Sequence, residues 1–283
     1  MLHYQAPLFR PPAEADSLIL QATLGCSHNR CSFCAMYRTK RYSERPVEQL
    51  LAEIEAVAAE DNTIRRLFLA DGDALQLPTD HLLQILEQLA RHFPALQRSS
   101  CYATPANLLG KSVAELTALQ EAGLKLIYLG IESGHDPLLR IINKGATQQQ
   151  LQEAMQRAFD AGLKTSATVI LGLGGQQMAD DHIADTVTLL NRAPVHYLST
   201  LQLFLDPEQE APFANRFEGC YQPQSAMGIL TELAQLIDGL KRPPRPIVFR
   251  SNHSSNMLPL AGNLPKHRPQ LLQQIAQVQL QLR

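Results

Sequence analysis

The stretch "LGCSHNRCSFCAMY" (residues 24–37) holds three of the five cysteines in the chain, Cys26, Cys31 and Cys34, with the spacing C-x4-C-x2-C. Thiolates this close in sequence can hold one metal ion or one iron–sulfur cluster. An iron–sulfur cluster is normally held by four cysteines. Three thiols would leave one iron without a protein ligand, and an open position on a metal is where a small molecule can bind. The triplet therefore indicates chemistry at the metal.

A structural metal site is the alternative interpretation of the same stretch. A closed zinc site takes four ligands, and His28 could supply the fourth. However, His28 is only two residues after Cys26, whereas zinc sites usually draw ligands from two separated segments. Of the two remaining cysteines, Cys101 is expected to be a small buried side chain, and Cys220 has no assigned role.

Apolar strands and amphipathic helices alternate on the C-terminal side of this stretch. The strand that leads into the cysteines is predicted at residues 18–24. Five further strands with their following loops are predicted in "TIRRLFLADGDAL" (63–75), "SSCYATPANLL" (99–109), "LKLIYLGIESG" (124–134), "LKTSATVILGLGG" (163–175) and "VHYLSTLQLFL" (195–205). Strands separated by helices imply parallel pairing with right-handed crossovers.

The helix signals are specific at several places. Ser43 and Pro46 are expected to open a helix in "SERPVEQLLAEIEAVAAED" (43–61). Capping boxes are predicted for Ser112 with Glu115 and for Thr147 with Gln150. Gly123 is expected to end the first of these two helices. A helix over residues 225–240 and a Gln-rich amphipathic helix at the end complete the pattern.

Six such units predict either a doubly wound sheet or a barrel, whole or partial. In both architectures ligands bind at the carboxyl ends of the strands. The cysteine loop and the segments "ADGDAL", "ATPAN", "IESG" and "LGLGG" all follow strands, so they are expected to face one mouth. No linker composition divides the chain, which favours one domain with a C-terminal extension.

These residues resemble the radical S-adenosylmethionine (radical SAM) superfamily. Its usual motif is C-x3-C-x2-C with an aromatic residue before the last cysteine; here Phe33 is that aromatic, and one extra residue separates the first two cysteines. "GIESGHDPLLRIINKGAT" (130–147) resembles the fourth-strand segment of the superfamily, and "VILGLGG" (169–175) resembles its fifth-strand glycine motif. "ADGDAL" (70–75) lies where the superfamily has a Gly-Gly-Glu stretch. The tail "VFRSNHSSNMLPLAGNLP" (248–265) resembles that of proteins described as Fe–S oxidoreductases.

The resemblance implies a partial (β/α)6 TIM-like barrel of the radical SAM type, with a helical C-terminal extension. It divides the chain into an N-terminal extension (1–17), the barrel core (18–205) and the C-terminal extension (206–283). It also implies a 4Fe–4S cluster on Cys26, Cys31 and Cys34, with S-adenosylmethionine (SAM) on the fourth iron. Reduction would cleave SAM to methionine and a 5′-deoxyadenosyl radical, which abstracts hydrogen from an unknown substrate. A flavodoxin or ferredoxin would supply the electron.

Six residues are implied to bind the cofactors. Asp73 would hold the SAM amine. Glu132, with the help of Ser133, would hold the ribose, and Gly172, followed by Gly174 and Gly175, would lie beside the adenine. Lys144 or Arg140 would pair with the SAM carboxylate. Tyr37, together with Phe33, would shield the cluster.

Each assignment has a simpler alternative. Asp71 and Asp73 could cap a turn, Glu132 could be an ordinary salt-bridge partner, and Lys144 could be a solvated surface residue. Four polar residues of the tail could line the substrate side of the barrel or form an ordinary loop. They are Arg250, Asn252, His253 and Asn256.

Composition limits the other functional classes. The formal net charge of −2 favours neither nucleic acid nor an anionic membrane. No uninterrupted apolar run reaches roughly 18 residues, and the N-terminal stretch has no apolar signal core, so a cytoplasmic protein is expected. Two alternative functions remain open, namely a zinc or Fe–S binding module without SAM chemistry and a radical SAM enzyme that modifies RNA. The second would use the basic residues Lys241, Arg242, Arg245 and Arg250.

Overall fold

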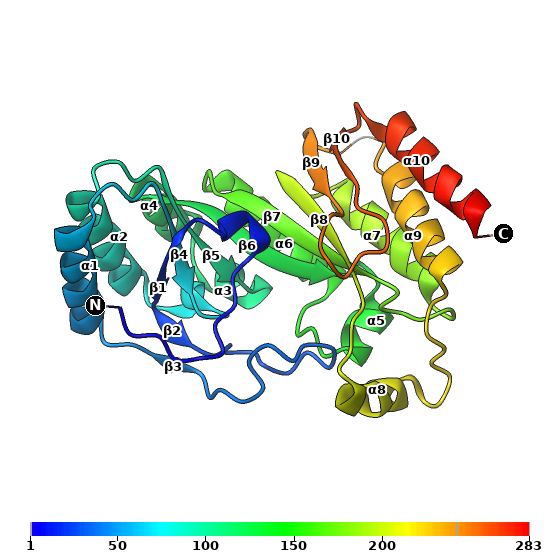
Figure 1. Ribbon diagram of the computed structural model, residues 1–283, viewed down its shortest axis with the longest axis horizontal. Helices are drawn as coiled ribbons and strands as arrows, with labels where there is room; N and C mark the ends of the chain where they lie inside the picture. Colours follow the sequence, from blue (N-terminus) through cyan, green and yellow to red (C-terminus); the bar gives the residue numbers. More distant parts are fainter. Residues whose placement is uncertain (1, 242, 283) are drawn as a thin grey trace. The chain divides into compact units, whose positions relative to one another are not determined.

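The computed structural model describes residues 2–241 and 243–282, and Arg242 therefore lies outside the described residues. The chain forms two compact units (Figure 1). The first contains residues 1–29, 36–129 and 157–165; the second contains residues 30–35, 130–156 and 166–283. The boundary falls inside the cysteine loop, so Cys26 belongs to the first unit, and Cys31 and Cys34 belong to the second.

The first unit is built on parallel strands. In spatial order they are β1 (Leu18–Gln21), β4 (Arg66–Ala70), β5 (Arg98–Ala103) and β6 (Leu124–Glu132), of which β6 continues into the second unit after Leu129. Its helices are α1 (Val47–Glu60), α2 (Thr79–His92), α3 (Pro105–Gly110) and α4 (Val113–Glu121), with short 3-10 turns at η1 (Pro12–Glu14) and η2 (Ala74–Gln76). Helices α1 and α4 both pack against α2 along one side of the strands (Figure 1).

The second unit repeats this plan with β7 (Lys164–Leu171) and β8 (Tyr197–Gln202), which pair in parallel. Strand β9 (Ile247–Arg250) pairs in parallel with β8, and β10 (Ala261–Leu264) pairs antiparallel with β9. The helices are α5 (Asp136–Ile141), α6 (Gln148–Asp160), α7 (Ala179–Leu190), α8 (Pro207–Ala214), α9 (Ala226–Gly239) and α10 (Arg268–Gln281), with a 3-10 turn at η3 (Asn215–Phe217). Residues 157–160 of α6 and 164–165 of β7 belong to the first unit. The C-terminal extension is thus not only helical, since β9 and β10 also belong to it.

Two short strands close the cysteine loop at its base. The predicted single strand over residues 18–24 divides at Ala22, because β1 pairs with β4 whereas β2 (Thr23–Leu24) pairs antiparallel with β3 (Ser43–Glu44). Ser43 therefore lies in a strand and does not open a helix, which corrects the prediction at that residue. Helix α1 begins after Pro46, whose ring fixes the backbone φ at a value that suits a helix start.

Other sequence signals are confirmed. Ser112 and Glu115 form a capping box at the start of α4, and Thr147 and Gln150 exchange backbone-to-side-chain hydrogen bonds before α6. Gly123 follows the last turn of α4 with φ +121°, a value that glycine adopts readily because it has no Cβ. Within the described residues, no helix is long and apolar enough to cross a membrane.

The carboxyl ends of the parallel strands carry the polar segments in each unit. In the first unit the ends of β1, β4 and β5 lead to the cysteine loop, to Asp71 and to Thr104. In the second unit the ends of β7 and β8 lead to Gly172 and to the loop before α8. Ligands of α/β proteins bind at such strand ends.

Candidate functional site

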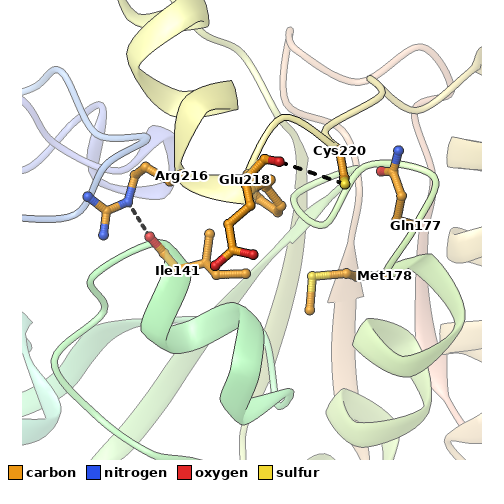
Figure 2. A pocket seen from close by; sticks show the side chains of 7 residues that line it. Ile141, Gln177, Met178, Arg216, Glu218 and Cys220 are labelled. Atoms are coloured by element: carbon orange, nitrogen blue, oxygen red, sulfur yellow. Dashed lines mark hydrogen bonds between the residues drawn. The ribbon is translucent and has the colours of Figure 1, made fainter.

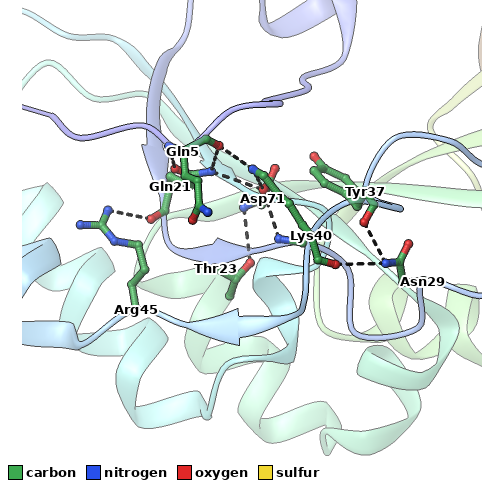
Figure 3. Close-up of polar contacts among 9 residues, drawn as sticks. Gln5, Gln21, Thr23, Asn29, Tyr37, Lys40, Arg45 and Asp71 are labelled. Atoms are coloured by element: carbon green, nitrogen blue, oxygen red, sulfur yellow. Dashed lines mark hydrogen bonds and ion pairs between the residues drawn. The ribbon is translucent and has the colours of Figure 1, made fainter.

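Asp71 anchors the start of the cysteine loop. Its side chain is fully buried, and Oδ2 accepts hydrogen bonds from the Gly25 amide (3.2 Å), the Gln21 Nε2 amide (3.3 Å) and the Lys40 ammonium (2.8 Å). Figure 3 shows Gln21 and Lys40 beside the Asp71 carboxylate. Gly25 directly precedes Cys26, and Lys40 lies three residues after Tyr37. The Asp71 carboxylate therefore fixes both ends of the loop. Asp71 Oδ2 is thus used within the protein, whereas its Oδ1 is buried and has no hydrogen-bond partner among the described residues.

The middle of the loop is held by Asn29 and Tyr37. The Asn29 amide donates hydrogen bonds to the Tyr37 carbonyl (2.8 Å) and the Lys40 carbonyl (3.3 Å). The Tyr37 ring is buried, meets the Phe9 ring edge-on at 5.4 Å between centroids, and lies over Gly72, where any side chain would collide with it. Burial, with the Asp71 carboxylate nearby, raises the pKa of the Tyr37 phenol. Tyr37 therefore packs beneath the loop as a neutral aromatic residue.

Asp73 lies beside the cysteine end of the same loop. Its Oδ2 accepts a hydrogen bond from the Ser27 hydroxyl, and Ser27 is the residue after Cys26. Its Oδ1 is buried and has no hydrogen-bond partner among the described residues. Burial raises the pKa of Asp73 to about 6, although the Ser27 hydrogen bonds, Asn107 and His28 oppose the shift. An unpaired buried carboxylate oxygen is suited to accept a donor from a bound molecule.

The segment with the other two cysteines belongs to the second unit. The Cys34 amide donates to the Cys31 carbonyl (3.1 Å), and the Ser32 amide donates to the Ile142 carbonyl (2.9 Å). These bonds form a tight turn and attach it to the end of α5. The Ser32 hydroxyl is buried and has no hydrogen-bond partner among the described residues. Phe33, between Ser32 and Cys34, is half-buried and not a core residue.

Glu132 and Lys144, which were predicted as separate SAM contacts, contact each other. The Lys144 ammonium lies 3.0 Å from Glu132 Oε1, and both side chains are nearly buried. A side chain at Gly130 would collide with Glu132, so the first glycine of "GIESG" makes room for this pair. Burial would lower the pKa of Lys144, but Glu132 and then Cys31 and Cys34 raise it above the usual value. A positive charge therefore lies near the thiols of Cys31 and Cys34.

Ser133 is engaged by a histidine that the sequence analysis missed. The Ser133 hydroxyl contacts His182 Nδ1 (2.8 Å), and His182 Nε2 contacts the Ile170 carbonyl of β7 (3.0 Å). A carbonyl only accepts, so Nε2 carries the proton and Nδ1 accepts from Ser133. Burial lowers the pKa of His182 to about 4, which keeps the ring neutral. His182 lies on the buried face of α7, and a histidine on an apolar helix face was the only signal.

Gly172 is held by a second residue that was missed, Glu232 of α9. The Gly172 amide donates to Glu232 Oε2 (2.6 Å), and the Gln224 amide donates to Oε1 (3.1 Å). Burial raises the pKa of Glu232 to about 7, although both hydrogen bonds oppose the shift. A side chain on Gly172 would collide with Ile229 of α9. The equivalent spaces at Gly174 and Gly175 are taken by Met178 and the Gln222 carbonyl. No sequence signal linked α9 to this turn.

The remaining candidates lie in ordinary environments. Arg140 is exposed at the end of α5. Asn256 connects its loop to β8, because it accepts from the Gln202 amide (2.7 Å) and donates to the Thr200 carbonyl (2.7 Å). His253 is exposed and contacts Ser255 Oγ (2.8 Å). Cys101 is fully buried, as predicted, and burial raises the pKa of its thiol.

The residues of the cysteine loop fit an iron–sulfur cluster with a bound amino acid group. All five cysteines are thiols, and those of the triplet are half-exposed. Lys144 supplies positive charge near Cys31 and Cys34, which favours thiolates. The buried Ser32 hydroxyl and Asp73 Oδ1 have no hydrogen-bond partner among the described residues. The hydroxyl is suited to donate to a cluster sulfide, and the carboxylate oxygen is suited to accept from an ammonium group. Within the described residues, no group of three or more His, Cys, Asp or Glu side chains is placed to hold a metal ion, the cysteine triplet included, so the fit is one of residue types and spacing.

Comparisons with known proteins give the same picture. The family model "Radical SAM superfamily" matches residues 20–190. The chain is 26% identical over 183 residues to an uncharacterised methyltransferase, PH0819, of Pyrococcus horikoshii, covering 63% of this chain and 38% of that protein. It is 31% identical over 173 residues to biotin synthase of Alkalilimnicola ehrlichii, covering 59% of this chain and 49% of that protein. The chain thus spans half or less of the length of these relatives.

A solved structure shows the same fold. The radical SAM enzyme coproporphyrinogen III oxidase (HemN) of Escherichia coli aligns with a TM-score of 0.59 at 17% identity, over 80% of this chain and 52% of HemN. The family match confirms the predicted superfamily and enzyme class, and with them the 4Fe–4S cluster and SAM that enzymes of this superfamily bind. With its α/β fold, its cysteine triplet and a family match over more than half of its length, the chain belongs to the radical SAM superfamily.

Proposed function

We propose that this protein cleaves SAM reductively and uses the resulting radical to abstract hydrogen from a small molecule. The observation that carries the proposal is the triplet Cys26, Cys31 and Cys34, which lies in the loop after the first strand and inside the region matched by the family model. When bound, the cluster would supply the electron that breaks the carbon–sulfur bond of SAM, giving methionine and a 5′-deoxyadenosyl radical.

The residues of this chain would bind and orient the cofactors. Cys26, Cys31 and Cys34 hold the cluster, and the Ser32 hydroxyl donates a hydrogen bond toward it. Asp73 accepts the SAM ammonium at its unpaired Oδ1. Glu132 and Lys144 present one negative and one positive group at the end of β6, which suit the ribose hydroxyls and the SAM carboxylate. Ser133 orients this strand end through His182, and Gly172 lies beside the adenine.

Two further parts of the proposal concern the surroundings of the enzyme. The electron donor is a flavodoxin or ferredoxin, by analogy with the superfamily. The compartment is a reducing one, the cytoplasm, because five cysteines without a disulfide are typical of proteins there.

Anaerobic reconstitution tests the proposal directly. The protein is supplied with iron, sulfide and dithionite, and 5′-deoxyadenosine is measured with SAM present. The wild type is expected to bind about four iron and four sulfide per chain and to form 5′-deoxyadenosine, whereas Cys26→Ala/Cys31→Ala/Cys34→Ala forms none. Formation of 5′-deoxyadenosine by the triple variant, or one zinc and no sulfide in anaerobically purified wild type, would contradict the proposal and favour a binding module.

A further inference from the structure

A cavity of about 310 Å³ opens at the strand ends of the second unit (Figure 2). Three segments line the cavity, and each comes after a strand. They are the end of α5, which follows β6, the turn after β7, and the segment after α8, which follows β8. The first contributes Ile141, the second Gln177 and Met178, and the third Arg216, Phe217, Glu218 and Cys220. The volume is at the lower end of the range for small-molecule sites, and the position is where α/β proteins bind ligands.

The walls of the cavity are fixed by packing and hydrogen bonds. Phe217 packs on Phe213 (5.3 Å between ring centroids) and on Tyr221 (4.7 Å), so the segment after α8 rests on an aromatic cluster. The Arg216 guanidinium donates to the Ile141 carbonyl and to Asn143 Oδ1. Figure 2 shows the bond to Ile141 on the side of that residue that faces away from Gln177 and Met178. The cavity is therefore formed before any ligand arrives.

The lining has one charge available to a ligand. Ile141, Met178 and Phe217 supply apolar surface. The Glu218 side chain extends toward Ile141 in Figure 2, and its carboxylate has no hydrogen-bond partner among the described residues. Arg216, the other charged residue, already binds the two groups named above. An apolar wall with one free carboxylate favours a ligand that has an apolar body and a cationic nitrogen.

The cavity is also attached to the cysteine segment. Ile141 precedes Ile142, whose carbonyl accepts the Ser32 amide between Cys31 and Cys34. We propose that this cavity binds the substrate, and that the substrate is a small amine with an apolar chain whose ammonium pairs with Glu218. The inference rests on the proposed function, because it assigns the molecule from which hydrogen is taken.

Cys220 provides a readout that does not depend on SAM cleavage. Its thiol is exposed at the rim of the cavity, so a bound ligand should slow its alkylation by iodoacetamide. The full chain is reconstituted anaerobically and alkylated at pH 7 with or without n-pentylamine or pentanoate, and the Cys220 peptide is quantified by mass spectrometry. The variants are Glu218→Gln, which removes the charge, and Glu210→Gln, an exposed carboxylate on α8 that does not line the cavity.

We expect pentylamine to slow alkylation of Cys220 in the wild type and in Glu210→Gln. In Glu218→Gln the concentration for half-protection should rise about two- to fivefold, because a partly exposed ion pair contributes that much. Met178→Trp, which narrows the cavity, should weaken protection. Equal protection by pentanoate, no protection by pentylamine, or an unchanged concentration in Glu218→Gln would overturn the inference. Because 5′-deoxyadenosine is measured separately, failure of the cavity and failure of SAM cleavage are distinguishable.

Discussion

Asp71 and Asp73 are two residues apart and have different environments. Asp71 Oδ2 accepts hydrogen bonds from Gln21, Gly25 and Lys40, so part of its carboxylate is used to hold the loop. Asp73 has an unpaired oxygen and a pKa raised to about 6 by burial, so it is mainly ionised at pH 7.5. Asp71 Oδ1 is also buried without a hydrogen-bond partner among the described residues, so the unpaired oxygen does not separate the two. Asp71 already forms an ion pair with the buried Lys40, whereas no ion pair of Asp73 is found among the described residues, which makes Asp73 the better candidate for binding the SAM ammonium.

Asp73→Asn is expected to weaken SAM binding without changing the iron and sulfide content. A hydrogen bond to a charged group contributes about 1.5–3 kcal/mol, so the dissociation constant should rise roughly 10- to 100-fold. Equilibrium dialysis of SAM against the reconstituted protein at pH 7.5 measures this. Asp61→Asn, which changes an exposed carboxylate after α1, is the matched control. Equal affinities for the two variants would exclude Asp73 as the ammonium contact.

Glu232 should make stability depend on pH. Its folded pKa of about 7 lies above the usual value, so the folded state binds the extra proton between about pH 4.5 and pH 7. The contribution of this group to stability is therefore present at low pH and is lost as the pH rises to 7. The loss is at most about 3 kcal/mol. Urea unfolding at pH 5 and pH 8 should show that Glu232→Gln gains stability relative to the wild type as the pH increases. A difference that does not change with pH would contradict the raised pKa.

At the scale of elements, the cysteine loop is closed before any cluster binds. The ladder of β2 with β3 closes its base, and the Lys40–Asp71 ion pair, with side chains 4% and 0% exposed, holds its two ends. A buried ion pair strongly destabilises the protein when only one partner is removed, because the other charge stays buried. The loop therefore depends on the pair being complete.

Lys40→Met is expected to lower the free energy of unfolding by about 3–5 kcal/mol, because Asp71 loses its counterion. Lys40→Met/Asp71→Leu should recover a large part of this loss, since no unpaired charge remains. Chemical denaturation of the wild type, both single variants and the double variant closes a double-mutant cycle. A double variant that is as unstable as the sum of the single changes would show that the two residues do not interact.

At the scale of the whole molecule, the C-terminal extension forms part of the second unit. Helix α9 packs against α7 and α10, and β9 adds to the edge of β8. Five apolar side chains of α9 are buried, namely Ile229, Leu230, Leu233, Leu236 and Ile237. Burial of one such side chain contributes about 1.5–3 kcal/mol, so their sum is comparable to the stability of a domain.

A chain that ends at residue 205 is therefore expected not to fold cooperatively. Removal of residues 206–283 would expose the buried faces of α7 and β8 and leave the Gly172 amide without Glu232. Circular dichroism during heating should show no sharp transition, and a hydrophobic dye should bind strongly to the shortened chain. A sharp transition at the wild-type temperature would instead support residues 18–205 as an independent core, the boundary predicted from the sequence.

The sequence alone determined the main helices and strands of residues 18–205 and their order, but not the β2–β3 pair or the strands β9 and β10. The spacing of Cys26, Cys31 and Cys34, the capping boxes at Ser112 and Thr147, and the alternation of strands with helices are local signals, and local signals are readable without coordinates. The prediction at Ser43 was wrong because Ser43 pairs with Leu24, which lies 19 residues earlier in the sequence, and such a pairing leaves no signal among the sequence neighbours of Ser43.

Only the tertiary structure decided which side chains are available. Asp71 is paired by Lys40, Glu132 by Lys144, Ser133 by His182, and the Gly172 amide by Glu232. Each partner is 12 or more residues distant in sequence. A buried charge or amide must be satisfied by whatever group the fold brings near it. The sequence therefore identified the thiols that define the chemistry, and the fold determined which polar groups remain to meet the cofactor and the substrate.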